Sequence, residues 1–179
     1  MSNFNNLLKP RIVNIENVSL NYTRVTLEPL ERGFGHTLGS ALRRIMLSSI
    51  VGSSITEVSI DGVQHEYSTI EGIQEDVIDI MLNLKDISFR MNGNSSATLS
   101  LSKNEVGPVT ASDIELKGDI EIVNPDYVIA NITTKGASID MQIEVSEGIG
   151  YSSANQRKDD VNRIVGSLLI DASYSPIKK

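Results

Sequence analysis

Apolar and polar positions alternate along most of the chain and predict a protein built mainly of β-strands. In the N-terminal part, two short strands are expected over residues 11–20 and 22–30, separated by Asn21. Another strand is expected over residues 54–60, where Asp61-Gly62 marks a tight turn. The same period of two recurs in later segments, at Ile87, Phe89, Met91, Ala97, Leu99, Leu101, Ile120, Ile122, Val128, Ala130, Ile132, Ile139, Met141, Ile143 and Val145.

Turn residues separate several of these later strands. Asn92-Gly93 lies between the runs at 87–91 and 97–101, and Lys135-Gly136 lies between those at 128–132 and 139–145. Each pair of runs therefore predicts a hairpin, and hairpins favour antiparallel or mixed sheets. Residues 146–163 have no periodicity and are expected to form a loop.

Two segments have the spacing of helices. The first runs from about His36 to Ser49 and has an apolar stripe, formed by Leu38, Ala41, Leu42, Ile45 and Met46. The second runs from about Thr69 to Leu84, where Ser68 and Glu71 have the spacing of a capping box. A weaker helical turn is expected near residues 160–166. The fold class predicted is α+β, and not a doubly wound sheet.

Composition and charge narrow the function. The chain has no cysteine and two histidines, so neither a thiolate metal site nor a histidine-rich one is expected, and no cofactor is predicted. A net charge of −7 argues against direct DNA binding, because phosphate contacts require clustered basic residues. The polar N-terminus and the absence of an apolar run of about 20 residues predict a cytoplasmic protein without a membrane span.

The sequence shows no pattern of catalytic residues. Residues 33–39 contain three glycines but lack the lysine of a phosphate loop, and the adjacent carboxylates Glu75-Asp76 and Asp159-Asp160 do not converge on one point. By contrast, Gly39, with Ser40 and Ala41 beside it, gives the first helix a small-residue face. Such a face suits either an oligomer interface or an intramolecular contact.

Several segments resemble bacterial RNA polymerase α subunits. The two most specific are Val25–Ser49, which contains Glu31-Arg-Gly-Phe-Gly-His-Thr-Leu-Gly39, and Ile60–Asp76; shorter similarities lie at residues 80–85, 107–111, 123–125 and 169–176. The resemblance implies two subdomains. Residues 1–50 plus 167–179 would form a dimerisation subdomain of strands and helices, incomplete at its C-terminal end, and residues 51–166 an inserted β-rich subdomain.

Site residues follow from the same resemblance. The dimer interface is expected at Phe34, Gly35, Leu38, Gly39, Leu42, Ile45 and Met46. The contact with the polymerase β subunit is expected at Arg44, Leu47, His65, Glu66, Tyr67, Ser68, Thr69, Glu71, Gln74, Glu75 and Asp76. Members of the family continue past the position of Lys179 with a second dimerisation helix, so residues 1–179 alone are expected to dimerise weakly or not at all.

The implied function is that of a non-catalytic assembly scaffold within DNA-directed RNA polymerase, a nucleotidyltransferase. Its partners would be a second α subunit, as a homodimer or heterodimer, then the β and β′ subunits, and transcription regulators. One alternative is a stand-alone α-like paralogue that binds polymerase subunits or regulators. Another is a small α+β enzyme, which would require a polar cluster in a cleft.

Overall fold

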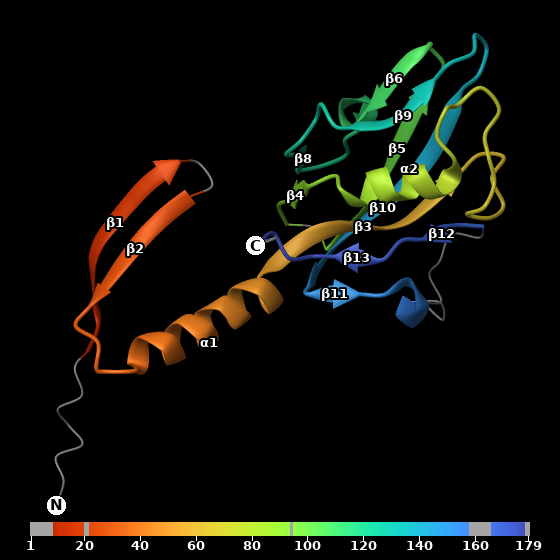
Figure 1. Cartoon of the computed structure of the whole chain (residues 1–179). Helices are drawn as coiled ribbons and strands as arrows, with labels where there is room; N and C mark the ends of the chain where they lie inside the picture. Colours follow the sequence, from red (N-terminus) through yellow and green to blue (C-terminus); the bar gives the residue numbers. More distant parts are fainter. Residues whose placement is uncertain (1–8, 20–21, 94, 158–165, 178–179) are drawn as a thin grey trace, which may run out of the picture. The chain divides into compact units, whose positions relative to one another are not determined.

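The computed structural model describes residues 9–19, 22–93, 95–157 and 166–177, and the chain divides into two units, Met1–Met46 and Leu47–Lys179 (Figure 1). In the first unit, β1 (Arg11–Ser19) pairs antiparallel with β2 (Tyr22–Glu28). α1 (Phe34–Ser48) follows, close to the predicted helix. None of the described residues of this unit is buried.

The second unit is a β-rich body around a seven-stranded sheet. The strand order is β7-β5-β10-β3-β4-β8, with β12 also paired to β3, and every pairing is antiparallel. The strands of this sheet are β3 (Val51–Ile60), β4 (Phe89–Met91), β5 (Ser96–Lys103), β7 (Ile114–Glu115), β8 (Ile120–Ile122), β10 (Ile139–Ile149) and β12 (Leu168–Leu169). Two small sheets pair β6 (Gly107–Thr110) with β9 (Val128–Ile132), and β11 (Tyr151–Ser152) with β13 (Ala172–Ser173).

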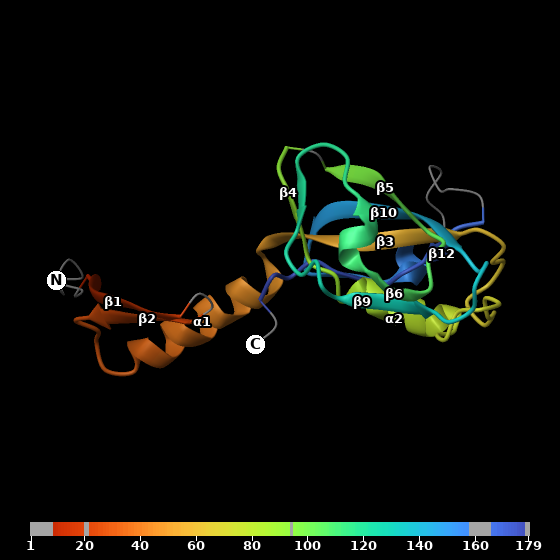
Figure 2. The same cartoon turned by 90° about the horizontal axis from the view of Figure 1, so that it is seen from above.

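Short helices complete this unit: α2 (Val77–Lys85) and the 3₁₀ turns η2 (Ala111–Asp113) and η3 (Ala154–Arg157). α2 lies in front of β3 in Figure 1 and below it in the view from above (Figure 2), so it covers one face of the sheet. The buried side of α2 carries Val77, Ile80 and Leu84. Alternate residues of β10 are buried in the same core, which is built mainly of Ile, Leu and Val as the composition requires.

Tyr174 of the C-terminal segment packs against two glycines of the sheet. Gly148 and Gly52 are direct partners in the β10–β3 pairing. Tyr174 is buried beside them, its backbone N–H donates to the carbonyl of Gly150 (2.8 Å), and its hydroxyl lies 3.0 Å from Oγ of Ser146. A Cβ on Gly148 would come within 2.6–2.8 Å of three ring atoms of Tyr174. A Cβ on Gly52 would lie 1.9 Å from the backbone carbonyl oxygen of Tyr174. Gly148 therefore leaves room for the ring, and Gly52 leaves room for the backbone.

The structure confirms the predicted strands but not the two later hairpins. β4 pairs with β3 and β8, whereas β5 pairs with β10 and β7, so the runs around Asn92-Gly93 are not partners. Likewise β9 pairs with β6 and not with β10. Alternation shows which side of a strand is buried, but the same alternation fits many partners.

The second predicted helix also begins later than expected. Residues 69–76 form turns and isolated bridges, and α2 begins at Val77 with Asp76 as its N-cap, whose carboxylate accepts from the N–H of Asp79 (2.8 Å). Gly72 has a φ of 83°, which ends any helical path at that point. The prediction of a loop over residues 146–163 was wrong in part, because this range contains the end of β10, all of β11 and the turn η3, which ends at residue 157. The expected helical turn near 160–166 lies almost entirely outside the described residues.

Candidate subunit-contact surfaces

Residues 65–76, which join β3 to α2, form the first surface, and we call them the contact loop. Its backbone turns on itself: the N–H and hydroxyl of Ser68 both donate to the carbonyl of His65, and the N–H of Val77 donates to the carbonyl of Ser68 (3.2 Å). A short bridge also joins Thr69 and Asp76. The segment is therefore an ordered turn-rich loop without helix.

One side of the contact loop is fastened to β9. The carbonyl of Gly72 accepts from the backbone N–H (2.8 Å) and the hydroxyl (3.1 Å) of Thr133, and the N–H of Gln74 donates to the carbonyl of Asn131 (3.0 Å). Gly72 itself lies so close to its neighbours that an added Cβ would be 2.5 Å from Cβ of Ala137 and 3.1 Å from Cβ of Thr134. The loop thus occupies the edge of β9 that β6 leaves open.

The other side of the contact loop faces solvent. Most of the residues predicted from the resemblance are exposed there: His65, Glu66, Tyr67, Thr69, Glu71, Gln74 and Asp76. Ser68 and Glu75 are half-buried. Tyr67 is 77% exposed, which is unusual for an aromatic side chain and typical of an anchor that a partner buries. Together with three exposed carboxylates, Tyr67 makes this an acidic surface with one aromatic group.

A groove continues from the contact loop onto α2. It has a volume of about 320 Å³ and is lined by Glu66, Ile78, Met81, Leu82, Lys85, Ala154, Leu169, Ile170 and Asp171. The N–H of Ala154 donates to the carboxylate of Asp171 (2.8 Å), and this bond and the Tyr151 hydroxyl lower the pKa of Asp171. The hydrogen bond between the Tyr151 hydroxyl and Asp171 also raises the pKa of Tyr151. The groove therefore has an apolar floor and charged margins.

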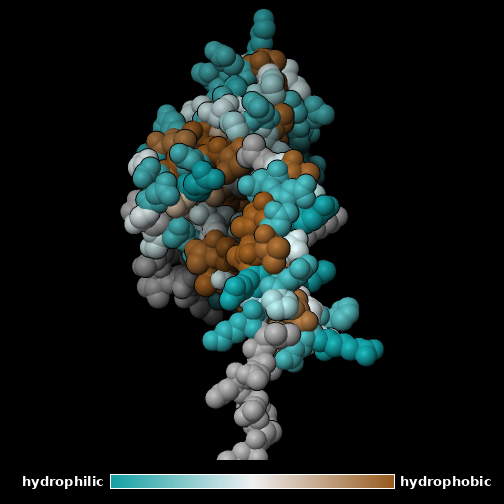
Figure 3. Space-filling model, turned by 90° about the vertical axis from the view of Figure 1, so that its left-hand side faces the viewer, coloured by the Kyte–Doolittle hydropathy of each residue, from teal (hydrophilic) through white to brown (hydrophobic). Residues whose placement is uncertain are grey.

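The apolar stripe of α1 forms the second surface. Phe34, Leu42, Ile45 and Met46 are exposed, Ile45 to 56%, while Leu38 is half-buried. Gly35 and Gly39 are exposed beside them. The face shown in Figure 3 carries brown apolar areas between teal polar ones. The residues predicted for a dimer interface thus share one helix and remain accessible in the single chain.

The hairpin β1–β2 adds apolar surface beyond the residues that the resemblance indicates. Ile12, Val13, Ile15, Val18 and Val25 are all at least half exposed. Ile12 lies opposite Leu27 and Ile15 lies opposite Val25, so these side chains meet across the hairpin on one face. This repeat of apolar residues was the available signal, since an apolar face of a hairpin indicates a surface that becomes covered.

Arg44 and Leu47 complete the set of predicted residues. Arg44 is exposed on α1, and Leu47 near the end of that helix is half-buried. Arg44 belongs to the first unit, whereas the contact loop belongs to the second. The β-subunit contact and the dimer interface remain predictions at the level of single residues.

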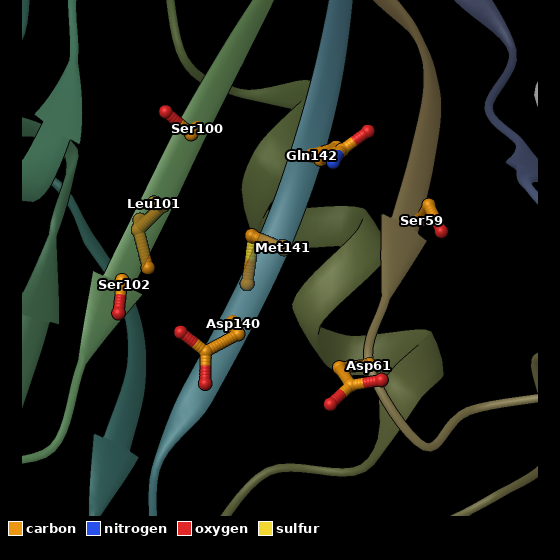
Figure 4. A pocket seen from close by; sticks show the side chains of 8 residues that line it. All are labelled: Ser59, Asp61, Ser100, Leu101, Ser102, Asp140, Met141 and Gln142. Atoms are coloured by element: carbon orange, nitrogen blue, oxygen red, sulfur yellow. The ribbon is translucent and has the colours of Figure 1, made fainter.

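A shallow hollow lies on the sheet itself (Figure 4). It has a volume of about 480 Å³ and is lined by Ser59, Asp61, Ser100, Leu101, Ser102, Asp140, Met141 and Gln142. Its lining comes from β3, β5, β10 and the residue after β3, and it combines polar side chains with the apolar Leu101 and Met141. Within the described ranges, no group of three or more His, Cys, Asp or Glu side chains is placed to hold a metal ion. In the same ranges, no helix is both long and apolar enough to cross a membrane.

The contact loop and the apolar stripe of α1 are features typical of a protein that binds other proteins in an assembly. Residues 58–175 match the family model of the RNA polymerase Rpb3/RpoA insert domain, a range that covers nearly all of the packed second unit. The chain therefore belongs to the RNA polymerase Rpb3/RpoA insert domain family, which confirms the resemblance to the N-terminal domain of RNA polymerase α subunits. It is a subunit of a DNA-directed RNA polymerase and assembles with other subunits of that enzyme.

Proposed function

We propose that this chain is the assembly scaffold of a bacterial RNA polymerase. In this role it dimerises through its first unit, binds the β and then the β′ subunit, and contributes no catalytic group. The main support is the contrast between its two units. The second unit has an extensive buried core, whereas the described residues of the first unit bury none of their side chains.

The state of the first unit supports the dimerisation role. An isolated two-stranded hairpin is at best marginally stable, and isolated helices of up to about 15 residues are marginally stable as well. α1 has 15 residues and exposes most of its apolar stripe, and the hairpin exposes a second apolar set. A second α subunit that covers these residues would supply the missing core.

The contact loop supports the role in recruiting the β subunit. Its fastening to β9 holds the backbone, while Tyr67 and the carboxylates remain exposed. A fixed loop loses little conformational entropy on binding, so a partner gains more of the contact energy. The division into residues 1–50 plus 167–179 and residues 51–166 remains part of this proposal. In the structure, β12 pairs with β3, which attaches residues 168–169 to the second unit.

The proposal is tested by co-expressing the full chain with the β and β′ subunits of its own organism. We expect stoichiometric co-purification of a complex with two copies of this chain, measured by native mass spectrometry. Ile45→Lys should reduce dimer formation, because it places a charge on the apolar stripe. His36→Lys is the matched control, since nine positions along the helix place the exposed His36 about 180° away from Ile45.

The outcomes separate the alternatives. Capture of neither large subunit by a well-folded chain would contradict the scaffold role and favour a stand-alone paralogue. Equal loss of dimer in both lysine variants would contradict the assignment of the interface to the apolar stripe.

A further inference from the structure

Glu75 is a half-buried carboxylate of the contact loop whose side chain is bonded to β9. Its Oε2 accepts from the backbone N–H of Asn131 (2.6 Å), and its Oε1 accepts from Nδ2 of the same residue (2.7 Å). Asn131 is half-buried as well. Each carboxylate oxygen has a donor inside the fold, so the side chain is fixed against Asn131 on the β9 side of the loop.

This carboxylate takes the place of a backbone carbonyl. Along the edge of β9, Thr133 donates to the carbonyl of Gly72 and Asn131 accepts from the N–H of Gln74, as in an antiparallel ladder. The N–H of Asn131 would then require a further carbonyl from the loop, and the Glu75 side chain supplies the acceptor instead. The backbone is therefore free to leave the edge at Glu75 and to enter α2 at Val77.

We propose that Glu75 is a positioning residue that acts through Asn131. It holds residues 65–74 in the shape that meets the partner subunit, and it does so without touching that subunit. This inference rests on the proposed function, because it assigns a role within the contact with the β subunit. It also divides the contact loop into residues that bind, such as Tyr67 and Glu71, and one that fixes the loop.

A reciprocal substitution separates positioning from direct contact. Glu75→Gln turns one acceptor into a donor, and a flip of the Asn131 side-chain amide lets its Oδ1 accept from that donor, so both hydrogen bonds are kept and only the charge is lost. Asn131→Asp places a second carboxylate against that of Glu75. In the double variant, the new amide at position 75 can accept through its carbonyl from the backbone N–H of residue 131. Its NH₂ group can donate to the new carboxylate at position 131. Both hydrogen bonds are then restored, and the negative charge moves from residue 75 to residue 131.

The experiment uses the full chain and the β subunit of its own organism. Affinity is measured by biolayer interferometry, and protection of the amides of residues 65–74 is measured by hydrogen exchange on the free chain. We expect Asn131→Asp to weaken binding about tenfold and to speed exchange in the loop, because two carboxylates then face each other. Glu75→Gln should change neither readout by more than about twofold, because it keeps both hydrogen bonds. The double variant should return within about twofold of the unaltered chain in both readouts. Glu121→Gln on β8 removes a like charge outside the loop and should change neither.

Two results would overturn the inference. One is weak binding by Glu75→Gln and by the double variant with unchanged exchange, which would mean that the Glu75 charge touches the partner. The other is equal loop protection in all four chains, whether or not they bind. Failure of the unaltered chain to bind the β subunit would instead refute the proposed function, and the exchange rates would still decide whether the bonds of Glu75 to Asn131 order the loop.

Discussion

Gly148→Ala tests the packing of the C-terminal segment against the sheet. The new methyl group would overlap the ring of Tyr174, from which it would lie only 2.6–2.8 Å away. Gly148 is not among the glycines with positive φ, so alanine fits its backbone conformation. In a strand interior alanine is favoured over glycine by roughly 0.5–1 kcal/mol, so a loss of stability must come from displacing the ring.

The magnitude follows from what the ring loses. Burial of an apolar side chain of this size contributes roughly 1.5–3 kcal/mol, and the hydrogen bond between the Tyr174 and Ser146 hydroxyls roughly 0.5–1.5 kcal/mol. After subtracting the gain from replacing glycine, we expect Gly148→Ala to lower the free energy of unfolding by about 1–4 kcal/mol. Tyr174→Phe should lower it by only about 1 kcal/mol, because it removes the hydrogen bond alone.

Urea denaturation of the full chain, followed by circular dichroism, measures these differences. The decisive comparison places Gly148→Ala in a Tyr174→Ala background. There the clash is gone, so the alanine should be neutral or stabilising by up to about 1 kcal/mol. An equal loss in both backgrounds, or no loss in the unaltered one, would refute the idea that Gly148 makes room for the ring.

Three further predictions concern charge and the contact surfaces. Burial and the neighbouring carboxylate of Glu57 raise the pKa of Glu144 above its ordinary value of 4.5. Between the unfolded and the folded pKa, the folded chain therefore holds a proton that the unfolded chain has released. The loss of folding stability caused by the charged Glu144 is absent below pH 4.5, grows as the pH rises toward the folded pKa and is fully present above it. Glu144→Gln should therefore stabilise the chain at pH 7 but not at pH 4. Equal gains at both pH values in thermal melts would contradict this. Arg44→Ala should weaken binding of the β subunit roughly thirtyfold with the fold retained, because truncation of a hot-spot arginine costs about 2 kcal/mol of binding free energy. Undiminished capture of the β subunit in a pull-down would count against this. Gly39→Ala, whose Cβ would meet nothing within 4 Å, should stabilise α1 by about 1 kcal/mol yet weaken dimerisation, and a dimer of unchanged affinity in sedimentation would show that no backbone approaches there.

The sequence predicts local structure well where one physical cause dominates. The alternation at Ile139, Met141, Ile143 and Val145 predicts a strand with one buried face, and all four are buried on β10. The stripe of α1 is equally clear, because helical spacing alone brings its apolar residues together. The predicted α+β class agrees with described residues that form mostly β-sheet with two α-helices.

Pairing and loop geometry depend on residues far apart in the chain. The turn at Lys135-Gly136 suggests a hairpin, but β10 pairs with β3 and β5, and no local pattern identifies these partners. Similarly, the capping-box spacing of Ser68 and Glu71 is overridden by the bonds of Gly72 and Glu75 to β9. The resemblance could name the residues of the contact loop, but only the structure shows that the Glu75 side chain is engaged within the fold.

The lack of buried side chains among the described residues before Leu47 has a consequence for how the chain behaves in dilution. Whatever surface covers the hairpin and helix adds its binding free energy to their folding, about 2.7 kcal/mol when that surface is present at roughly a hundred times its Kd. The stability of the first unit is therefore set by mass action, whereas that of the second unit is set by its own core. Copies of this chain that are too dilute to pair keep an exposed hairpin and helix, which are open to proteases. Degradation of such unpaired copies would then remove them without any dedicated sensor.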